Sequence, residues 1–454
     1  NLWREAPFPS GCKKAAMSAQ LDTLYPDHLR TLRARADQVL ADAGYGDLLI
    51  GAGLPPLKFL DDQDYPFVAN PWFRHWLPLT DAPGSWVVHT PGSRPRLIFV
   101  QPRDYWHVVP QTPDAYWTRE FELSIVPSAA EALAQLPGGH NAVIVADAVA
   151  QGFAADPSLA SALDALNWQR SSKTAYELEL LREANRIGAR AHRAAEQAFR
   201  AGGSELDTHL AYLAAARQTD AELPYASIVG INTHGAILHY SAFDRAAPEL
   251  SHSLLIDAGA SCAGYGSDIT RTHAGPKAWE FQALVDAVDA AQQGFVAKVR
   301  AGQDYAQLHL HAHLVLADIL RRQGFFRMSA ESAVECGVSR AFFPHGLGHM
   351  LGAQVHDVTG QQQSEAGGRI DPPAGHPHLR MTRVLQPGMV VTIEPGVYFI
   401  DMLLAGLREQ PFASDLDWVR IRHFRQFGGV RIEDDVVCTG DAPENLTRDA
   451  FAAA

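Results

Sequence analysis

The sequence has few cysteines, no excess of positive charge and no long apolar run. Its four cysteines lie far apart and form no Cys-x-x-Cys pair, which argues against a disulfide framework or a cysteine zinc site and predicts a cytoplasmic location. No segment approaches the roughly 18–20 apolar residues of a bilayer span, so no membrane partner is expected. Acidic residues outnumber basic ones by 51 to 38, giving a formal net charge of −13. This balance argues against a nucleic-acid partner.

The remaining composition is that of a globular protein with more than one domain. The chain has 454 residues, of which 47% are hydrophobic and 20% charged. Residues 1–16 are irregular, and we interpret them as a tag or leader. Residues 17–166 alternate helix-like stretches with short apolar runs, which predicts an α/β domain. The polar segment 167–173 is predicted to be a linker, and 174–454 a second domain that mixes long helices with short strands.

Several elements are predicted from periodicity and capping signals. The expected helices are 28–43, 278–299, 305–323 and one that begins after Thr174, with Glu177 completing a capping box. The expected strands are 48–50, 86–89, 97–100, 142–146, 253–257, 390–394 and 429–437. The segment 361–380 is rich in glycine and proline, and a loop of that length inside a compact domain is often functional.

Two carboxylates lie on either side of a glycine-rich connection. Asp257 ends the apolar run 254–256, and Asp268 follows Gly264 and Gly266. Strands joined in this way form a hairpin, which places the two carboxylates side by side. Like charges at that distance repel, and one carboxyl takes up a proton unless a cation intervenes. A divalent metal pair removes the repulsion, and carboxylate with imidazole ligands suits manganese, cobalt, iron or zinc.

Histidines and further carboxylates supply the other ligand types. His345, His349 and His356 fall within twelve residues, among glycines that allow close approach. Glu394 ends an apolar run, and the proline and glycine after it break the strand.

The last candidate element is the strand 429–437. Its period of two places Arg431 and Glu433 on one face, with apolar side chains on the other. A carboxylate buried in such a strand needs a partner, and a metal pair supplies one.

Each of these features has an ordinary structural explanation when it is taken alone. An acidic residue at a strand end is usually a turn or cap residue, a lone histidine is usually structural, and Arg431 with Glu433 fits a surface strand. Together, five residues of ligand type at strand ends or glycine-rich turns predict a two-metal hydrolase. The predicted metal ligands are Asp257, Asp268, His349, Glu394 and Glu433.

These motifs resemble those of the pita-bread metallopeptidases, family M24, which include prolidase, aminopeptidase P and methionine aminopeptidase. The family's ligand order of Asp, Asp, His, Glu, Glu matches the five residues without a gap. The resemblance runs from Thr174 to the C-terminus and implies a pita-bread catalytic domain. The first half resembles the family's creatinase-like N-terminal α/β domain. The predicted fold class is therefore α/β (α+β), in two domains.

Finer matches favour the prolidases within the family. The segment 379–383 resembles the prolidase segment whose first arginine, here Arg380, holds the carboxylate of the dipeptide. The segments 398–401 and 424–429 are also prolidase-like. A bidentate grip on a free carboxylate favours Xaa-Pro dipeptides over longer peptides. It also avoids any need for a peptide N–H, which a bond to proline lacks.

The resemblance assigns roles to the ligands. Asp257 chelates one metal, His349 binds the other, Asp268 and Glu433 bridge them, and Glu394 completes the second site. A hydroxide between the cations is the nucleophile, because two cations roughly 3.5–4 Å apart lower the pKa of bound water. Glu394 carries the proton to the leaving nitrogen. The implied cofactors are two divalent ions per subunit, manganese by family habit, with cobalt, zinc or iron also compatible.

Other residues match family positions near the substrate. His239 and His356 would stabilise the oxyanion or anchor the substrate, and His345 and Arg431 would support the ligands. The catalytic candidates are Glu394, His356, His239 and His345. The substrate-binding candidates are His239, His356, Arg380, Arg431, Tyr225, Asp62, Leu238, Val355 and Tyr305. The expected partners are a small dipeptide and a second copy of the chain in a homodimer.

Rival functions use the same residues differently. The segment 59–62 matches the bacterial prolidases that include the organophosphorus acid anhydrolases, although 53–56 departs from that group's pattern. Hydrolysis of organophosphate triesters is therefore an alternative activity. Aminopeptidase P activity and a non-catalytic pita-bread binding protein are further alternatives, and the five intact ligands argue against the latter.

Overall fold

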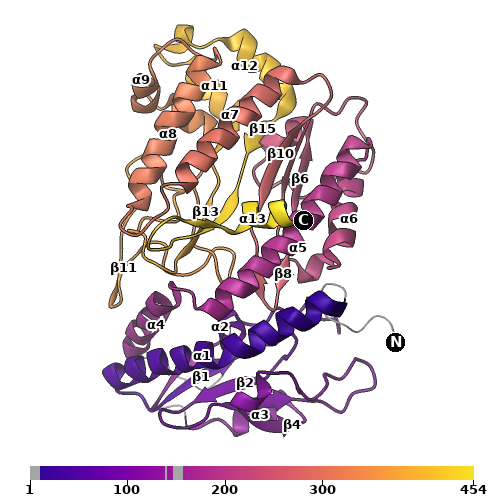
Figure 1. Ribbon diagram of the computed structural model, residues 1–454, viewed down its shortest axis with the longest axis vertical. Coiled ribbons are helices and arrows are strands. Elements are labelled where there is room, and N and C mark those ends of the chain that lie inside the picture. Colours follow the sequence, from indigo (N-terminus) through magenta and orange to yellow (C-terminus); the bar gives the residue numbers. More distant parts are fainter. Residues whose placement is uncertain (1–10, 139–140, 147–156) are drawn as a thin grey trace. The chain divides into compact units, whose positions relative to one another are not determined.

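The computed structural model describes residues 11–138, 141–146 and 157–454 (Figure 1). The chain divides into two compact units. Unit 1 comprises Asn1–Leu180, Cys262–Tyr265 and Gln362–Gly368, and unit 2 comprises Leu181–Ser261, Gly266–Gln361 and Arg369–Ala454. The first ten residues of the segment 1–16 lie outside the described residues. The segment 167–173, which we expected to be a linker, contains the end of helix α4, which runs to Arg170.

Unit 1 is built on one mixed sheet with the order β4-β3-β2-β1-β5. Its strands are β1 Asp47–Gly51, β2 Trp86–His89, β3 Arg96–Val100, β4 Glu122–Val126 and β5 Ala142–Val145. The sequence predicted every strand of this sheet except β4. That strand lies at the sheet edge and buries only Val126, so it lacks the apolar run by which the others were found.

Helices complete unit 1, and α1 lies along its sheet (Figure 1). They are α1 Gly11–Ala43, α2 Pro71–Trp76, α3 Ala129–Ala134 and α4 Pro157–Arg170. The next helix, α5 Ala175–Arg200, begins at the predicted capping box. The Thr174 backbone N–H donates to Glu177 Oε2 at 2.9 Å, and the Glu177 N–H donates to Thr174 Oγ1 at 3.4 Å.

Unit 2 carries three small sheets, whose orders are β10-β7-β6, β13-β16-β17 and β14-β15. Their strands are β6 Ile228–Ile231, β7 Ser253–Asp257, β10 Thr270–Ala274, β13 Val390–Ile393, β14 Gly396–Tyr398, β15 Gly429–Arg431, β16 Asp434–Val437 and β17 Glu444–Asn445. Two further pairs of short strands are β8 Ser261–Cys262 with β9 Tyr265–Gly266, and β11 Gln362–Ser364 with β12 Gly367–Arg369.

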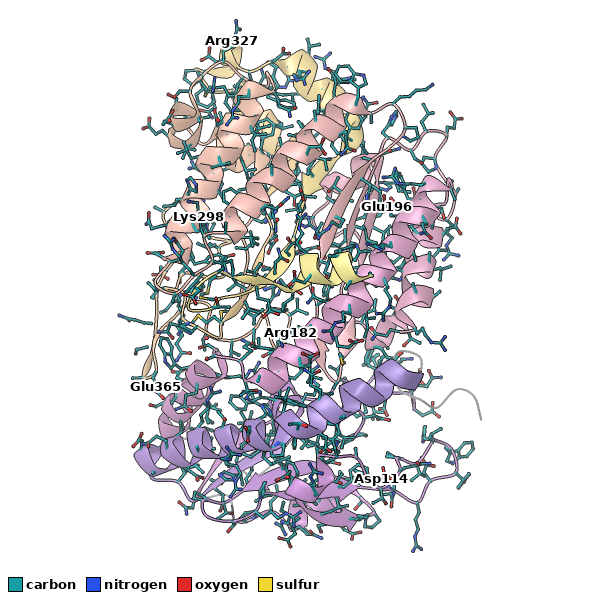
Figure 2. The ribbon with its side chains drawn as sticks, viewed as in Figure 1. Asp114, Arg182, Glu196, Lys298, Arg327 and Glu365 are labelled. Carbon is teal, nitrogen blue, oxygen red and sulfur yellow. The ribbon has the colours of Figure 1, made fainter. Side chains whose placement is uncertain are left out.

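Helices make up most of the rest of unit 2 (Figure 1). Besides α5 they are α6 Glu205–Ala216, α7 Trp279–Val296, α8 Tyr305–Arg322, α9 Ala330–Glu335, α10 Val338–Phe342, α11 Asp401–Arg408, α12 Trp418–Phe424 and α13 Leu446–Ala453. Of these, α6, α7, α10 and α13 pack against the strands of unit 2. Helix α5 carries Arg182 and Glu196, which are labelled in Figure 2; Arg182 pairs with Glu444 at 2.7 Å and Glu196 with Arg200 at 2.7 Å. None of the described helices is both long and apolar enough to span a membrane.

The strand predicted over 429–437 is wrong in one respect, because it is two strands rather than one. β15 pairs with β14, whereas β16 pairs with β13. The chain changes sheets at Ile432 and Glu433. The hairpin predicted around Asp257 is confirmed, since β7 and β10 are antiparallel with Asp257 opposite Thr270.

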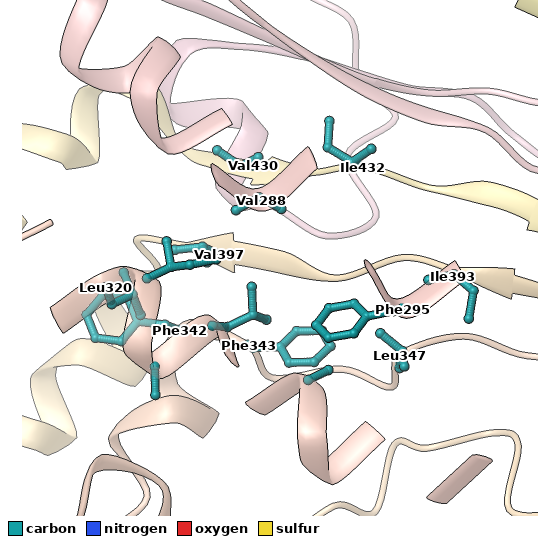
Figure 3. Close-up of a cluster of buried hydrophobic side chains, with 14 of the residues drawn as sticks. Val288, Phe295, Leu320, Phe342, Phe343, Leu347, Ile393, Val397, Val430 and Ile432 are labelled. Atoms are coloured by element: carbon teal, nitrogen blue, oxygen red, sulfur yellow. The ribbon is translucent and has the colours of Figure 1, made fainter. Parts of the chain in front are cut away.

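A large apolar cluster fixes the residues beside the candidate ligands. Leu347, Ile393 and Ile432 belong to this cluster and are at most 2% exposed (Figure 3). Ile393 and Ile432 each precede a candidate ligand in the chain, and Leu347 precedes His349 by two residues. Because neighbouring residues in extended chain point to opposite sides, anchoring Ile393 and Ile432 in the core turns Glu394 and Glu433 away from it.

Candidate metal centre

The centre of the site is a cluster of three residues from three different segments. Asp268 precedes β10, His349 follows α10, and Glu433 lies between β15 and β16. One ligand atom from each lies within 4.8 Å of the other two, and all three residues are buried. His349 Nε2 lies 3.2 Å from Asp268 Oδ2, and Glu433 Oε2 accepts a hydrogen bond from Thr270 Oγ1 at 2.6 Å.

Asp257 is held at the end of β7 by two donors. Tyr225 donates its hydroxyl hydrogen to Oδ1 at 2.7 Å, and Arg431 Nη2 donates to Oδ2 at 2.6 Å. Burial raises the pKa of Asp257, and the positive charge of Arg431 opposes that rise. These contacts aim the carboxylate and leave lone pairs on its two oxygens for a cation.

Glu394 lies beside His349 and His345. Its Oε1 is 3.7 Å from His349 Nε2, and its Oε2 is 3.5 Å from His345 Nδ1. Burial raises the pKa of Glu394 to about 7, although the positive charge of His349 opposes the rise. A carboxyl that titrates near neutral pH is well suited to accept and release a proton.

The cluster holds more negative charge than its side chains can balance. Burial and the nearby Asp268, Glu394 and Asp257 raise the pKa of Glu433 well above its usual value. Burial disfavours the charged form of His349, but the hydrogen bond and charge of Asp268 outweigh it and raise the pKa to about 9. The site thus draws protons to itself. Carboxylate oxygens with one imidazole match the preferences of divalent metal ions, so the residues present fit such ions.

Glycine at position 348 permits the chain around His349 to approach β13. A Cβ at Gly348 would collide with the carbonyl oxygen of Thr392 and the hydroxyl of Tyr305. The close approach lets the His349 backbone N–H donate to Thr392 Oγ1 at 3.1 Å, while the Glu394 N–H donates to the Leu347 carbonyl at 2.8 Å. His349 and Glu394 are thereby fixed side by side.

His356 lies at the exposed side of the cluster. Its ring centroid is 4.4 Å from that of His349, nearly perpendicular to it. Burial lowers the pKa of His356 to about 4, and the charges of His349, Arg380 and His239 contribute to this. His239 and Arg380 are themselves exposed. A neutral histidine and a cationic arginine therefore lie near the open side of the centre.

Comparison with protein-family models covers most of the chain. Residues 23–168 match the model described as Xaa-Pro dipeptidase, N-terminal domain. Residues 179–440 match the model of metallopeptidase family M24. The chain belongs to metallopeptidase family M24. All five candidate ligands fall within the second match, which confirms the family and the two-domain fold class that the motifs predicted.

Individual relatives of this M24 metallopeptidase agree with the family match. A Xaa-Pro dipeptidase of Xanthomonas campestris pv. campestris (strain B100) is 53% identical over 435 residues, which are 95% of this chain and 99% of the relative. A Xaa-Pro dipeptidase of Stenotrophomonas maltophilia (strain K279a) is 51% identical over 433 residues, or 95% of this chain and 98% of the relative. A solved structure of proline aminopeptidase P II from Yersinia pestis has a TM-score of 0.68 at 25% identity, covering 94% of this chain and 100% of that one.

The other candidate residues of the M24 metallopeptidase differ in burial and in what they contact. Tyr305 is fully buried and donates to the Thr392 carbonyl at 2.7 Å, so it supports β13 from the core. Leu238 packs against a small apolar cluster, and Val355 is partly buried beside His356. Asp62 is exposed in unit 1, and its role at the substrate stays a prediction.

Three residues that hold the site together were missed from the sequence. Tyr398 accepts from Arg431 Nη1 at 2.8 Å and bonds His345 Nε2 at 2.8 Å. Thr270 accepts from Arg431 Nε at 3.1 Å, and Asp435 Oδ2 accepts from the Asp268 backbone N–H at 3.0 Å. The one sequence signal was the acidic triplet that ends in Asp435, because three successive carboxylates among apolar residues need buried partners.

Replacing Tyr398 by phenylalanine is expected to weaken metal binding by about 10- to 100-fold, the usual cost of losing a group that orients a ligand. The hydroxyl joins His345 to Arg431, and Arg431 in turn holds Asp257. Its loss leaves two buried nitrogens unpaired, at about 1–3 kcal/mol each, so the melting temperature should fall as well. Metal titration and thermal unfolding measure the two effects. Tyr105→Phe, at an exposed tyrosine, is the matched control, and equal behaviour of both variants would contradict the prediction.

Proposed function

We propose that this M24 metallopeptidase is a Xaa-Pro dipeptidase that uses two divalent metal ions, manganese by preference, to hydrolyse dipeptides with a C-terminal proline. The main support for the proposal is that Arg380 lies near the carboxylate cluster, beside His356. Arg380 is exposed and lies close enough to His356 for its charge to lower the pKa of that histidine. Relatives at 51–53% identity over 95% of the chain carry the same name.

The ions would be held by the five acidic and imidazole ligands. Asp257 and His349 would each hold an ion, and Asp268, Glu433 and Glu394 would supply further carboxylate ligands. When bound, divalent cations supply Lewis acidity and activate water at neutral pH. Arg431 stays bonded to Asp257 and balances part of the negative charge. Tyr225 keeps the same carboxylate oriented through its hydroxyl.

Proton transfer would fall to Glu394. Its carboxylate, which lies 3.7 Å from His349 Nε2, would take a proton from the attacking water and return it to the proline nitrogen. His345 lies 3.5 Å from its Oε2, and burial lowers the pKa of His345 to about 3. A neutral His345 leaves Glu394 as the group that gains and loses the proton.

Substrate recognition would depend on exposed groups. The guanidinium of Arg380 would bind the free carboxylate of the proline in a bidentate contact. His356 and His239 would donate hydrogen bonds to the peptide carbonyl or its developing oxyanion. A longer peptide has no carboxylate at that position, and so loses the contact.

A homodimer in a reducing cytoplasm completes the proposal. Unit 1 exposes large apolar side chains between residues 54 and 68, with Phe59 90% and Leu60 91% exposed. Apolar side chains grouped in this way suit an interface between subunits. Cys336 and Cys438 carry free thiols, in keeping with a reducing compartment. Sedimentation of the wild type and of Phe59→Ser tests the dimer.

The substrate class is tested by comparing Ala-Pro with Ala-Pro-Ala on the manganese-loaded enzyme. We expect kcat/KM to be at least about tenfold higher for the dipeptide, since a lost charge-assisted contact is worth about 1.5–3 kcal/mol. Release of proline or of Pro-Ala is followed by chromatography. Faster cleavage of the tripeptide would instead indicate an aminopeptidase.

A further inference from the structure

Three histidines that play no part in the metal centre gather in the core of unit 2. His309 and His313 lie one turn apart on α8, and His376 lies in the segment after β12. Their ring centroids are 4.5–4.7 Å apart in each of the three pairs. His309 and His313 are 1% exposed and His376 is 9% exposed. One nitrogen from each ring lies within 4.8 Å of the other two.

Only some of the ring nitrogens in this cluster have hydrogen-bond partners in the part of the chain that the structure describes. His309 Nε2 lies 2.9 Å from His376 Nδ1, and His313 Nδ1 lies 3.1 Å from Ser339 Oγ. His309 Nδ1 and His313 Nε2 are buried and have no hydrogen-bond partner among the described residues. Buried polar atoms are nearly always paired. An ion bound through His309 Nε2 would leave His309 Nδ1 unpaired, so only His313 Nε2 indicates a missing partner.

The electrostatic surroundings keep the three rings neutral. Burial lowers the pKa of His309 to about 3 and that of His313 to about 2, and each of these histidines is also affected by its neighbours in the cluster. Burial and the charge of Arg340 lower the pKa of His376. Neutral imidazole is the form that binds metal ions. The positive charge of Arg340 repels any cation at this cluster, but Arg340 is partly exposed, so solvent screens that charge. A metal ion, unlike a proton, can offset the remaining repulsion by forming coordinate bonds to all three rings.

We propose that His309, His313 and His376 bind one further divalent transition metal ion, for which zinc fits best. In tetrahedral zinc sites the Zn–N distance of about 2.0–2.1 Å puts ligand nitrogens about 3.3 Å apart. The 2.9 Å between His309 Nε2 and His376 Nδ1 is close to that spacing. The ion gives His313 Nε2 its missing partner, while the Nδ1–H donates to Ser339 Oγ and fixes the tautomer.

The two kinds of site differ in chemistry. The metal centre is rich in carboxylate oxygen and suits manganese, whereas the three-histidine site offers only nitrogen and suits zinc, copper or nickel. Zinc there ties the segment 371–380 to α8, because His376 lies in that segment and the other two ligands lie on the helix. This proposal does not depend on the identity of the substrate.

Metal counting on the full-length, manganese-loaded protein tests the proposal. After equilibration with Zn²⁺ and removal of free ions, we expect one zinc per chain in addition to the manganese. His313→Gln should lose this zinc, and His311→Gln should keep it. His311 is exposed and lies on the same helix, so it is a matched control. Hydrogen exchange in 371–380 should slow when zinc binds to the wild type and not when it is added to His313→Gln.

Two further measurements distinguish the loss of a zinc ligand from misfolding of the variant. His376→Gln removes the ligand that lies outside α8, and it should also lose the zinc while its circular dichroism stays that of the wild type. Anomalous scattering at the zinc edge from wild-type crystals should place a peak among the three rings. The proposal is overturned if zinc only replaces manganese, if the extra zinc survives both His313→Gln and His376→Gln, or if no peak lies among the rings.

Discussion

Replacing Glu394 by glutamine is expected to reduce kcat for Ala-Pro by about 10²–10⁴-fold, the usual contribution of general acid–base catalysis. Glutamine keeps the shape of the side chain but cannot take up or release the proton. In the wild type, burial raises the pKa of Glu394 to about 7. Steady-state kinetics with saturating manganese measure the effect.

The Glu394→Gln experiment needs a control for metal loss, because Glu394 is also a proposed ligand. Metal content is therefore measured on the same preparations, and kcat is compared at full occupancy. Glu409→Gln, at an exposed glutamate just after α11, should keep wild-type kcat. If fully loaded Glu394→Gln stays within a few-fold of the wild type, Glu394 is not the proton carrier.

Replacing Arg380 by alanine is expected to lower kcat/KM for Ala-Pro by about 10- to 100-fold. A hydrogen-bonded contact between charged groups contributes about 1.5–3 kcal/mol, and a bidentate guanidinium–carboxylate pair lies at the strong end. The neutral analogue Ala-Pro-amide has no carboxylate to bind, so its turnover should be unchanged. The kcat/KM of Arg380→Lys for Ala-Pro should fall between those of the wild type and Arg380→Ala, because lysine keeps the charge but loses the planar fork.

The matched control for Arg380→Ala is Arg369→Ala. Arg369 is exposed, lies in the same part of the chain and pairs with Asp371 at 2.9 Å. Arg369→Ala should leave kcat/KM unchanged for both Ala-Pro and Ala-Pro-amide. An equal loss on Ala-Pro and Ala-Pro-amide in Arg380→Ala would show that Arg380 supports the fold of the segment rather than the substrate.

The sequence predicted the ligand cluster because each ligand has a local signature. Asp257 and Glu394 end apolar strands, and each is followed by residues that stop the strand. His349 follows glycines, one of which, Gly348, allows the close approach to Thr392. Apolar run, strand end and glycine turn are all properties of a few neighbouring residues, so they can be recognised without the rest of the fold.

The break between β15 and β16 could not be found in this way. The segment 429–437 has the alternation of a single strand, and nothing in it records that Gly429–Arg431 pairs with β14 while Asp434–Val437 pairs with β13. Strand pairing depends on partners 31–47 residues away in the chain. The period of two gives the face of each side chain but does not name its neighbour.

Local sequence patterns were enough to predict the residue types of the candidate metal centre, their positions at strand ends and the mixture of helices and strands in both halves. The same patterns could not predict that Tyr398 joins His345 to Arg431, that Asp435 holds Asp268, or that histidines 309, 313 and 376 share one buried cluster. The physical reason is that local patterns set conformation and exposure over a few residues. Contacts between distant segments arise only when the whole core has packed.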